Sequence, residues 1–195
     1  MDLRTHPLSN RFVRLEPLNE DHREPLRPLA DEPSLWAQSV MDGQGAAFDP
    51  WFEAMLEASR TPAQISFAVF DLIQHTYAGH TSYLNFVPAQ DRVEIGWTWY
   101  GKAFQGTHIN PACKRLLIGH AFEVGALRVE LKTGTENTHS QRAMTKMGAT
   151  REGVLRSHTR TWRGTRRDTV YFSILAQEWP KVRESLDQRL EGFTP

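Results

Sequence analysis

The chain has 195 residues, which suits one domain with a sizeable core or at most two small ones. Hydrophobic residues make up 39% and charged residues 24%, and the formal net charge is zero, so the bulk composition indicates neither disorder nor generic nucleic-acid binding. The only cysteine, Cys113, excludes an internal disulfide, and no apolar run reaches the roughly 20 residues that span a bilayer. These features predict a globular protein, cytoplasmic by default, without a membrane role.

The first half of the chain predicts strands joined by loops and helices. Residues 12–15 alternate like a strand, and Asn19 is typical of a helix start. A loop over residues 31–49 precedes a helix whose apolar positions begin at Trp51. Three successive strands are predicted at residues 65–70, 77–87 and 92–100.

The second half alternates strands with helices. The predicted helices cover about 111–126, 138–147 and 179–190, and the predicted strands cover 128–133, 154–162 and 169–175. Strands that run into helices after a three-strand meander predict an α/β or α+β sheet with helices on its faces. No repeat or linker divides the chain, so residues 1–195 are expected to form a single domain.

The run EIGWTWY, which ends the strand predicted at 92–100, alternates apolar and other residues. Apolar side chains from Val93 to Trp99 are expected on one face, and Glu94 shares the opposite face with Thr98. This pattern predicts a strand with one face in the core and a carboxylate on the other.

The stretch FQGTHINP, residues 104–111, leads from that strand into a helix. Free N–H groups and the helix dipole make such a turn a candidate phosphate site. Asn110 is also a favoured N-cap residue and Pro111 suits the first helical position, so capping alone would explain both. Both interpretations stay open at this point.

The stretch TENTHSQRAMTKMG places a serine in the first turn of another helix. Asn137 is the predicted N-cap, Ser140 stands at the third helical position, and Gly148 ends the helix. A hydroxyl there can donate to a developing anion such as a thiolate leaving group. Alternatively, Ser140 satisfies a local backbone group.

A cluster of positive charge surrounds the turn in residues 156–168. A solvated hairpin accounts for it, although basic and aromatic residues together also suit RNA, an acidic peptide or a metabolite. With a net charge of zero, nucleic acid is not predicted. The eight histidines and one cysteine show no close metal-ligand spacing, so no metal is predicted.

The combination of these pieces resembles a known family. Their order and spacing are similar to those of GNAT acyl-CoA N-acyltransferases of the RimJ/RimL type. The resemblance begins with FVRLEPL at residues 12–18 and continues through EIGWTWY, QGTHIN, RVELKT, ENTHS, KMGATREGVLR, RDTVYFSIL and EWP. It implies the GNAT fold, in which helices flank a central, mostly antiparallel, bent mixed sheet whose two middle strands splay apart.

The resemblance also implies where acetyl-CoA binds. In the family, the cosubstrate lies beside the strand that corresponds to residues 92–100, and backbone N–H groups of the following turn hold its pyrophosphate. Gln105, His108 and Asn110 fall on the three defined positions of the family pattern, and two of them depart from it, because His108 and Asn110 replace small residues. An imidazolium at His108 adds a charged donor or changes how the anion is bound. The implied cosubstrate site consists of Thr98, Trp99, Gln105, Gly106, Thr107, His108, Ile109, Asn110, Asn137 and Ser140.

Two catalytic roles follow from the same resemblance. Asn137 and Ser140 match the family's Asn-x-x-Ser, in which asparagine touches the pantetheine arm and serine is the acid for the departing thiolate. A base must also remove a proton from the attacking amine, and Glu94 is the first candidate. A surface ion pair with an arginine would explain Glu94 equally well, and His80 is the rival base because histidine titrates near neutrality.

The sequence therefore predicts an acetyl-CoA-dependent N-acetyltransferase that acts on a primary amine in a ternary complex, without a metal. The acceptor is either a protein N-terminus or a small molecule, and family analogy allows a homodimer. The alternative is a GNAT-fold protein that binds acyl-CoA for regulation with weak or no turnover.

Overall fold

Eight strands form one mixed sheet in the computed structural model, which describes residues 3, 6–61 and 63–193. Across the sheet the order is β1-β2-β3-β4-β5-β6-β8-β7, and only the β5–β6 pair is parallel. The strands are β1 (Leu8–Ser9), β2 (Val13–Pro17), β3 (Gln64–Asp71), β4 (Thr76–Val87), β5 (Arg92–Tyr100), β6 (Arg128–Gly134), β7 (Thr150–Arg160) and β8 (Arg166–Leu175). The predicted mixed, mostly antiparallel sheet is confirmed.

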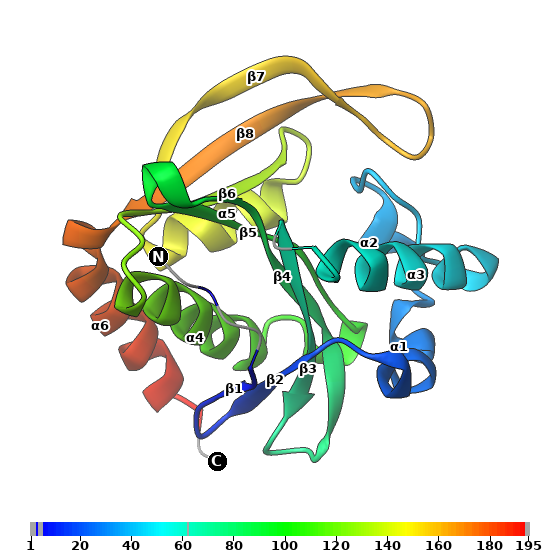
Figure 1. The fold of residues 1–195 in the computed structure, drawn as a ribbon, viewed down its shortest axis with the longest axis horizontal. Coiled ribbons are helices and arrows are strands. Elements are labelled where there is room, and N and C mark those ends of the chain that lie inside the picture. Colours follow the sequence, from blue (N-terminus) through cyan, green and yellow to red (C-terminus); the bar gives the residue numbers. More distant parts are fainter. Residues whose placement is uncertain (1–2, 4–5, 62, 194–195) are drawn as a thin grey trace.

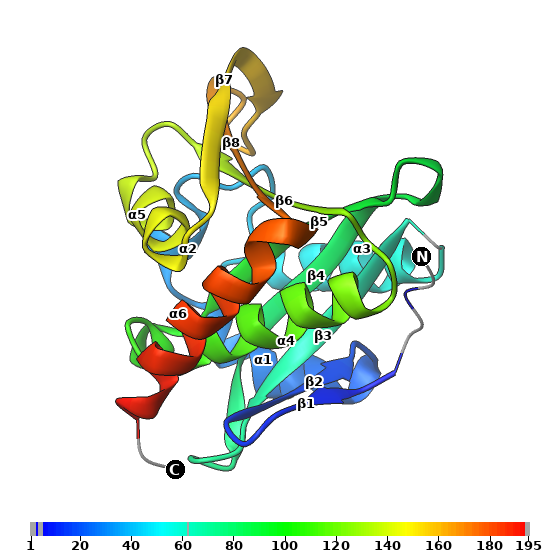
Figure 2. The same cartoon turned by 90° about the vertical axis from the view of Figure 1, so that its left-hand side faces the viewer.

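Helices cover both faces of this sheet. The helices are α1 (Arg23–Ala30), α2 (Pro33–Trp36), α3 (Phe48–Ser59), α4 (Ile109–Glu123), α5 (Thr138–Met147) and α6 (Trp179–Glu191). Figure 1 shows α4 and α6 on one face, with α1, α2 and α3 on the other. Figure 2 shows α4 and α6 side by side across the first face. This arrangement buries two apolar cores, one on each face of the sheet.

The two cores differ in composition. The core under α4 and α6 is built mainly from aliphatic side chains such as Leu117, Ile118 and Val129. The core under α1–α3 is aromatic, and Trp51 lies at its centre with ring centroids of Trp36 and Trp99 at 5.5 and 5.4 Å. Because aromatic rings are large, a small number of these side chains fills the space between the three helices and the sheet.

A bulge at Trp97 divides β5 between these two cores. Val93 and Ile95 pack under α4, whereas Trp99 packs in the aromatic core and Tyr100 returns to the α4 side. Trp97 has a φ of 49°, and pairing with β4 shifts register beside it. The expectation of a single apolar face from Val93 to Trp99 is therefore wrong, because the extra residue reverses the alternation.

The two parallel strands at the centre of the sheet separate after a short paired stretch. β5 pairs with β6 only from Arg92 to Glu94, opposite residues 128–130. Beyond Glu94, β5 continues beside β4 and β6 continues beside β8. The predicted splay between the middle strands is thus confirmed, and it leaves a gap between β5 and β6.

Candidate active site

The gap between β5 and β6 opens at the carboxyl ends of two parallel strands. The η4 turn (Lys102–Phe104) and α4 follow β5, while α5 follows β6. Ligands of open α/β sheets bind at such carboxyl ends, where neighbouring strands diverge and helices begin. The turn before α4 and the first turn of α5 are therefore the candidate positions for anion binding by backbone N–H groups.

The turn before α4 carries backbone donors that no described residue accepts. The N–H groups of Gly106, Thr107, His108 and Asn110 form no hydrogen bond with another described residue, while the N–H of Ile109 donates to Thr107 Oγ1 at 3.3 Å. Gly106 has a φ of 75°, and a Cβ built there would meet no heavy atom within 4 Å. The turn thus combines unpaired donors, a helix N-terminus and open space.

The start of α4 differs from the prediction. The helix begins at Ile109, so His108 occupies the N-cap position and Asn110 lies inside the first turn. The expected N-cap role of Asn110 is wrong, because its Oδ1 accepts a hydrogen bond from the Tyr100 hydroxyl at 3.4 Å instead. Asn110 therefore ties the first turn of α4 to the end of β5.

The imidazole of His108 lies in the core. Its Nε2 is 3.0 Å from Oδ1 of the fully buried Asp71, and the rings of Phe12 and Phe193 pack beside it at 5.8 and 5.9 Å. A side chain held in this way offers no charged donor to the turn. Only the backbone N–H of His108 remains as a donor there.

Two other predicted residues of this region have local hydrogen-bond partners, and a third is buried without one among the described residues. The Gln105 side chain donates to the Tyr100 carbonyl at 3.2 Å, and the Thr107 hydroxyl donates to the Phe104 carbonyl at 2.7 Å. Both contacts stabilise the turn from within. Trp99 is buried in the aromatic core, where its indole N–H has no partner among the described residues.

The first turn of α5 has the geometry that the sequence predicts. Asn137 Oδ1 accepts from the Ser140 N–H at 3.0 Å, and Gly148 ends the helix with a φ of 103°. The Ser140 hydroxyl, by contrast, forms no hydrogen bond with another described residue. The side chain that caps the helix is therefore Asn137, and the Ser140 hydroxyl remains a donor without a partner among the described residues.

Glu94 lies at the point where β5 leaves β6. Its side chain is 2% exposed, and one carboxylate oxygen accepts from Asn85 Nδ2 and from Lys132 Nζ, each at 2.8 Å. Lys132 stands on β6 and also faces the ring of Tyr171. The predicted arginine pairing is thus replaced by a lysine, and Glu94 is a buried carboxylate with a cation beside it.

His80, the rival base, is fully buried in the aromatic core. Its Nδ1 lies 2.8 Å from the Trp97 carbonyl, which fixes the tautomer with hydrogen on Nδ1, and its Nε2 has no partner among the described residues. Burial lowers the pKa of His80 to about 4, although the hydrogen bond to Trp97 partly opposes this shift. His80 is therefore neutral near neutral pH and lies away from the Glu94 cluster.

Lys114 is a functional candidate that the sequence analysis missed. It lies on α4 with 7% exposure, and its Nζ donates to Thr98 Oγ1 at 3.1 Å. Thr98 Oγ1 is in turn 2.8 Å from Thr81 Oγ1. Burial lowers the pKa of Lys114 to about 8, and no described carboxylate forms an ion pair with it.

The helical spacing contained a signal for Lys114. It interrupts a face of α4 whose other residues, such as Cys113, Leu117 and Ile118, are fully buried. A lysine at such a position either extends its head to water or serves a ligand. Thr98 shares this side because the Trp97 bulge turns it toward α4, away from the face of Glu94.

No group of three or more histidine, cysteine or acidic side chains is arranged to hold a metal ion among the described residues. In that same part of the chain, no helix combines the length and apolar character needed to cross a bilayer.

Comparisons with known proteins connect this geometry with a family. Residues 13–150 match the model of the acetyltransferase (GNAT) domain. Bacillus subtilis (strain 168) YdaF, provisionally named a ribosomal N-acetyltransferase, is 33% identical over 109 residues, which cover 55% of this chain and 58% of YdaF. The matched region thus spans less than two thirds of that relative.

Solved structures agree with this assignment over nearly the whole chain. A GCN5-related N-acetyltransferase from Brucella melitensis is 28% identical with a TM-score of 0.89, over 98% of this chain and 89% of its own. A provisionally named acetyltransferase from T. thermophilus is 35% identical with a TM-score of 0.85, over 97% of this chain and 100% of its own. The resemblance to GNAT acyltransferases is confirmed, and the chain belongs to the GNAT acetyltransferase domain family, whose acetyl donor is acetyl-CoA.

Proposed function

We propose that the protein is an acetyl-CoA-dependent N-acetyltransferase that transfers the acetyl group to a primary amine within a ternary complex. The observation that carries this proposal is the gap between β5 and β6, which has unpaired N–H groups at one side and the buried Glu94 carboxylate at the other. Acetyl-CoA, when bound, supplies an activated acetyl thioester. A nearby carboxylate and a positive helix terminus are what aminolysis of a thioester requires.

The residues at the start of α4 fit the diphosphate of this cosubstrate. Four backbone N–H groups are unpaired within the described ranges, and Gly106 leaves room for an anion. Gln105, Thr107 and Ile109 shape the turn, while Thr98 and Asn137 border the path toward the gap. Trp99 can contribute only its backbone there, because its ring is buried in the aromatic core. Lys114 extends this set, because a buried ammonium whose described partner is a hydroxyl has donors left for a phosphate oxygen.

The two catalytic assignments rest on chemistry at the two strand ends. We assign Glu94 to accept a proton from the attacking amine, since its carboxylate lies where β5 leaves β6 and is held in place by Lys132 and Asn85. We assign the Ser140 hydroxyl to donate to the departing thiolate, because it lies in the positive first turn of α5 and has no partner among the described residues.

Isothermal titration with acetyl-CoA, followed by thiol-release assays with a panel of peptide and small-molecule amines, tests this function. Saturable binding and amine-dependent release of CoA are expected. If acetyl-CoA binds but no amine in the panel stimulates CoA release, the chain acts as an acyl-CoA-binding regulator and the proposed activity is wrong for those acceptors.

The remaining assignments concern the chain as a whole. One domain over residues 1–195 is supported by a sheet that takes strands from both halves of the chain. A cytoplasmic location accords with the buried, unpaired Cys113. A homodimer is supported by β7, an edge strand with an unpaired side, and light scattering of the purified protein tests it.

A further inference from the structure

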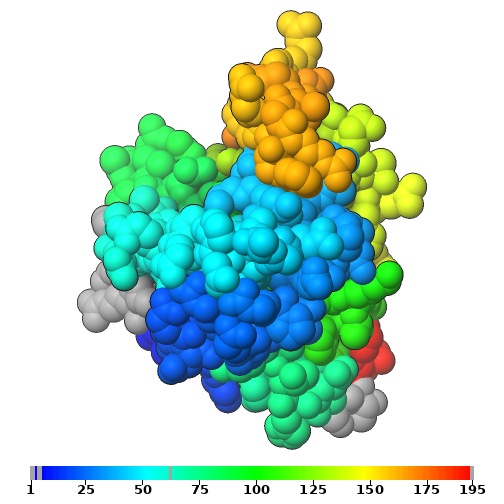
Figure 3. All heavy atoms as spheres, turned by 90° about the vertical axis from the view of Figure 1, so that its right-hand side faces the viewer, coloured from blue at the N-terminus to red at the C-terminus, as the bar shows by residue number. Residues whose placement is uncertain are grey.

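The β7–β8 hairpin is a protruding arm with its tip bent over the α2 side of the molecule. Figure 1 shows the hairpin arching beyond the body of the sheet, and Figure 3 shows it standing above the surface of the first helices. Two contacts anchor it: Trp162 Nε1 donates to the Trp36 carbonyl at 2.8 Å, and Arg167 donates to the Gln38 carbonyl. The hairpin is therefore held against the loop after α2, beside the end of β6.

The bend in the hairpin is built into its strands. Between Leu155 and Thr159 the pairing with β8 shifts register, and Ser157 has a φ of 51°. Asp168 Oδ1 accepts from the Ser157 N–H at 2.7 Å and holds the bulge in place. Asp168 keeps its negative charge, but over residues 150–175 six arginines stand against only two acidic residues, Glu152 and Asp168.

The charges of β7 are unbalanced. Arg151, Arg156 and Arg160 are exposed, and none of them forms a side-chain hydrogen bond or ion pair with another described residue. The acidic residue of the same strand, Glu152, is paired with Arg128 on β6 at 2.5 Å. The arm is therefore strongly cationic in a chain whose formal net charge is zero.

Arg167 of β8 places a further positive charge at the base of the arm, beside the end of β6. Its Cδ would lie 3.5 Å from a Cβ at Gly134, the last residue of β6, so the side chain sits at the carboxyl end of that strand. Its Nε is buried without a partner among the described residues, and burial lowers its pKa, against the opposing negative charge of Glu94. A guanidinium stays charged even so, and this one has a donor without an acceptor.

We propose that the acceptor is a polypeptide whose N-terminal amine is followed by acidic residues, with Arg167 binding the first carboxylate and the β7 arginines binding later ones. The inference rests on the proposed N-acetyltransferase function, since it places the amine near Glu94. Guanidinium groups bind carboxylates through paired, charge-assisted hydrogen bonds, and exposed arginines along a strand suit an extended chain.

The surroundings favour a peptide over RNA as the anionic partner. Figure 3 shows α1 and α3 below the arm. Their acidic side chains, among them Glu24, Asp49, Glu53 and Glu57, outnumber the three arginines that pair with them, Arg23, Arg27 and Arg60. A long polyanion that continued from the arm would meet this repulsive surface. A chain end that enters beneath the arm would contact only the arginines.

Paired peptides with the same N-terminal residue test the proposal. One peptide carries Asp and Glu at the following positions and the other carries Asn and Gln. Binding to the protein saturated with CoA is measured by fluorescence anisotropy, and kcat/KM by CoA release. We expect the acidic peptide to bind on the order of tenfold more tightly at low salt, with the preference shrinking as salt is raised.

Substitutions of arginines test whether the arm causes the preference for the acidic peptide. Arg167→Gln and the double variant Arg156→Gln/Arg160→Gln should each reduce the preference, whereas Arg183→Gln, an exposed arginine of α6, should leave it unchanged. The double variant changes only exposed side chains without described partners, so it remains informative if Arg167→Gln disturbs folding.

The outcomes separate this inference from the function on which it rests. Equal binding and equal kcat/KM for the two peptides would overturn the inference, even if amine-dependent CoA release upheld the activity. Preferential binding of the acidic peptide without acetyl transfer to it would also overturn the inference, because an acceptor must be acetylated, while CoA release with other amines would still uphold the activity. Tighter binding of a single-stranded RNA that displaces the acidic peptide would reassign the arm to RNA and overturn the proposal.

Discussion

Glu94 and Lys114 are both buried charged side chains beside the gap between β5 and β6, but they differ in their partners. Glu94 has a cation and an amide within 2.8 Å, so its charge is balanced. Lys114 has only a hydroxyl as its described partner, so no described negative charge balances its ammonium group. Because an unpaired buried charge is costly, Lys114 is the residue whose presence a bound anion would explain.

Replacement of Lys114 by methionine should weaken the binding of CoA. We expect a loss of about tenfold in affinity in calorimetric titration, because a charged donor to phosphate is removed. In the unmodified protein the affinity should fall as the pH rises through about 8, where Lys114 loses its proton, and this dependence should be absent in the variant. Lys146→Met, on the exposed side of α5, is the control. Equal affinities of Lys114→Met and the control for CoA would contradict a role of Lys114 in CoA binding.

Removal of the Ser140 hydroxyl should slow turnover more than it weakens binding. For Ser140→Ala we expect kcat to fall by about a hundredfold while the affinity for acetyl-CoA changes little, because the donor acts on the charge that develops on the leaving sulfur. Thr145→Ala, on the exposed surface of the same helix, is the control. A fall in affinity as large as the fall in kcat would instead mean that Ser140 serves binding.

Replacement of Glu94 by glutamine should lower kcat by about a hundredfold in the CoA-release assay, since an amide cannot accept the proton of the amine. Glu130 offers a matched control: it pairs with Glu94 across the parallel strands, is also buried, and is held by Arg92 and Arg128. Glu130→Gln should leave kcat nearly unchanged. An equal kcat for the two variants would refute Glu94 as the base.

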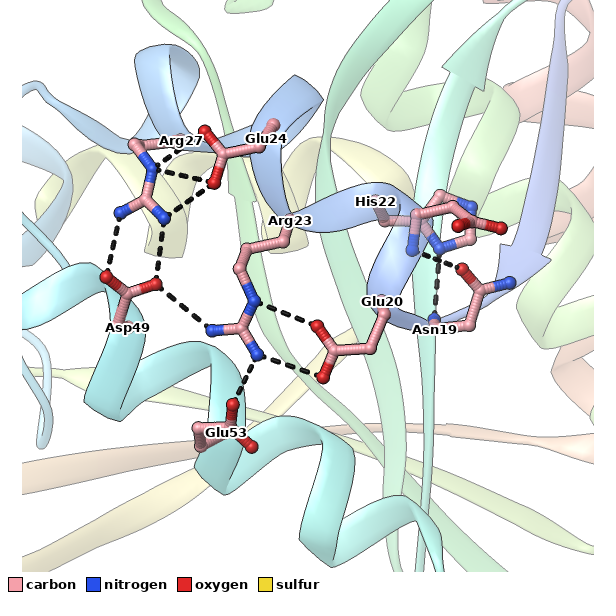
Figure 4. A network of polar contacts seen from close by, with 9 residues as sticks. Asn19, Glu20, His22, Arg23, Glu24, Arg27, Asp49 and Glu53 are labelled. Atoms are coloured by element: carbon pink, nitrogen blue, oxygen red, sulfur yellow. Dashed lines mark hydrogen bonds and ion pairs between the residues drawn. The ribbon is translucent and has the colours of Figure 1, made fainter.

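At the scale of elements, ion pairs fix the layer of helices that borders the acceptor side. Figure 4 shows Arg23 of α1 between Glu20, Asp49 and Glu53, and the distances to Glu20 and Asp49 are 2.9 and 3.0 Å. The guanidinium also lies 4.5 Å from the ring of Phe52. These contacts join α1 to α3, and the loop after α2, on which the hairpin tip rests, lies between these two helices in the chain.

Arg23→Met should therefore destabilise the protein more than the loss of an ordinary surface pair. We expect the free energy of unfolding to fall by about 0.5–1 kcal/mol in urea titration, the range of well-formed pairs with added ring contact. Arg60→Met, which loses a pair with Glu57 at the exposed end of α3, should change stability less. An equal change in both variants would show that the α1–α3 network adds nothing beyond single pairs.

At the scale of the whole molecule, Lys114 should make stability depend on pH. Its pKa is about 8 in the folded chain and 10.5 for an ordinary lysine, so between these values the unfolded chain binds more protons and stability rises with pH. Lys114→Met should raise the free energy of unfolding near neutral pH by about 1–3 kcal/mol, a gain that vanishes above about pH 10.5. Urea unfolding of the variant and the unmodified protein, near neutral pH and above about pH 10.5, checks this. If Lys114→Met instead lowers the free energy of unfolding, the lysine stabilises the folded chain.

Local signals were sufficient for much of the fold and part of the site. The period of the strands and helices, the N-cap Asn137 and the C-cap Gly148 are set by neighbours in sequence, and the structure confirms them. The bulge at Trp97 and the start of α4 were missed, because they depend on packing against α3 and on the contact between Tyr100 and Asn110.

The sequence by itself determined the order of the elements, the family and the chemical types at the site, because these follow from spacing along the chain. Only the tertiary structure decided how those groups are used. It buried the His108 ring against Asp71, paired Glu94 with Lys132 and gave Lys114 no carboxylate partner among the described residues. Burial and pairing depend on strands and helices distant in sequence, and these contacts decide which charge is neutralised in the fold and which is left for a ligand.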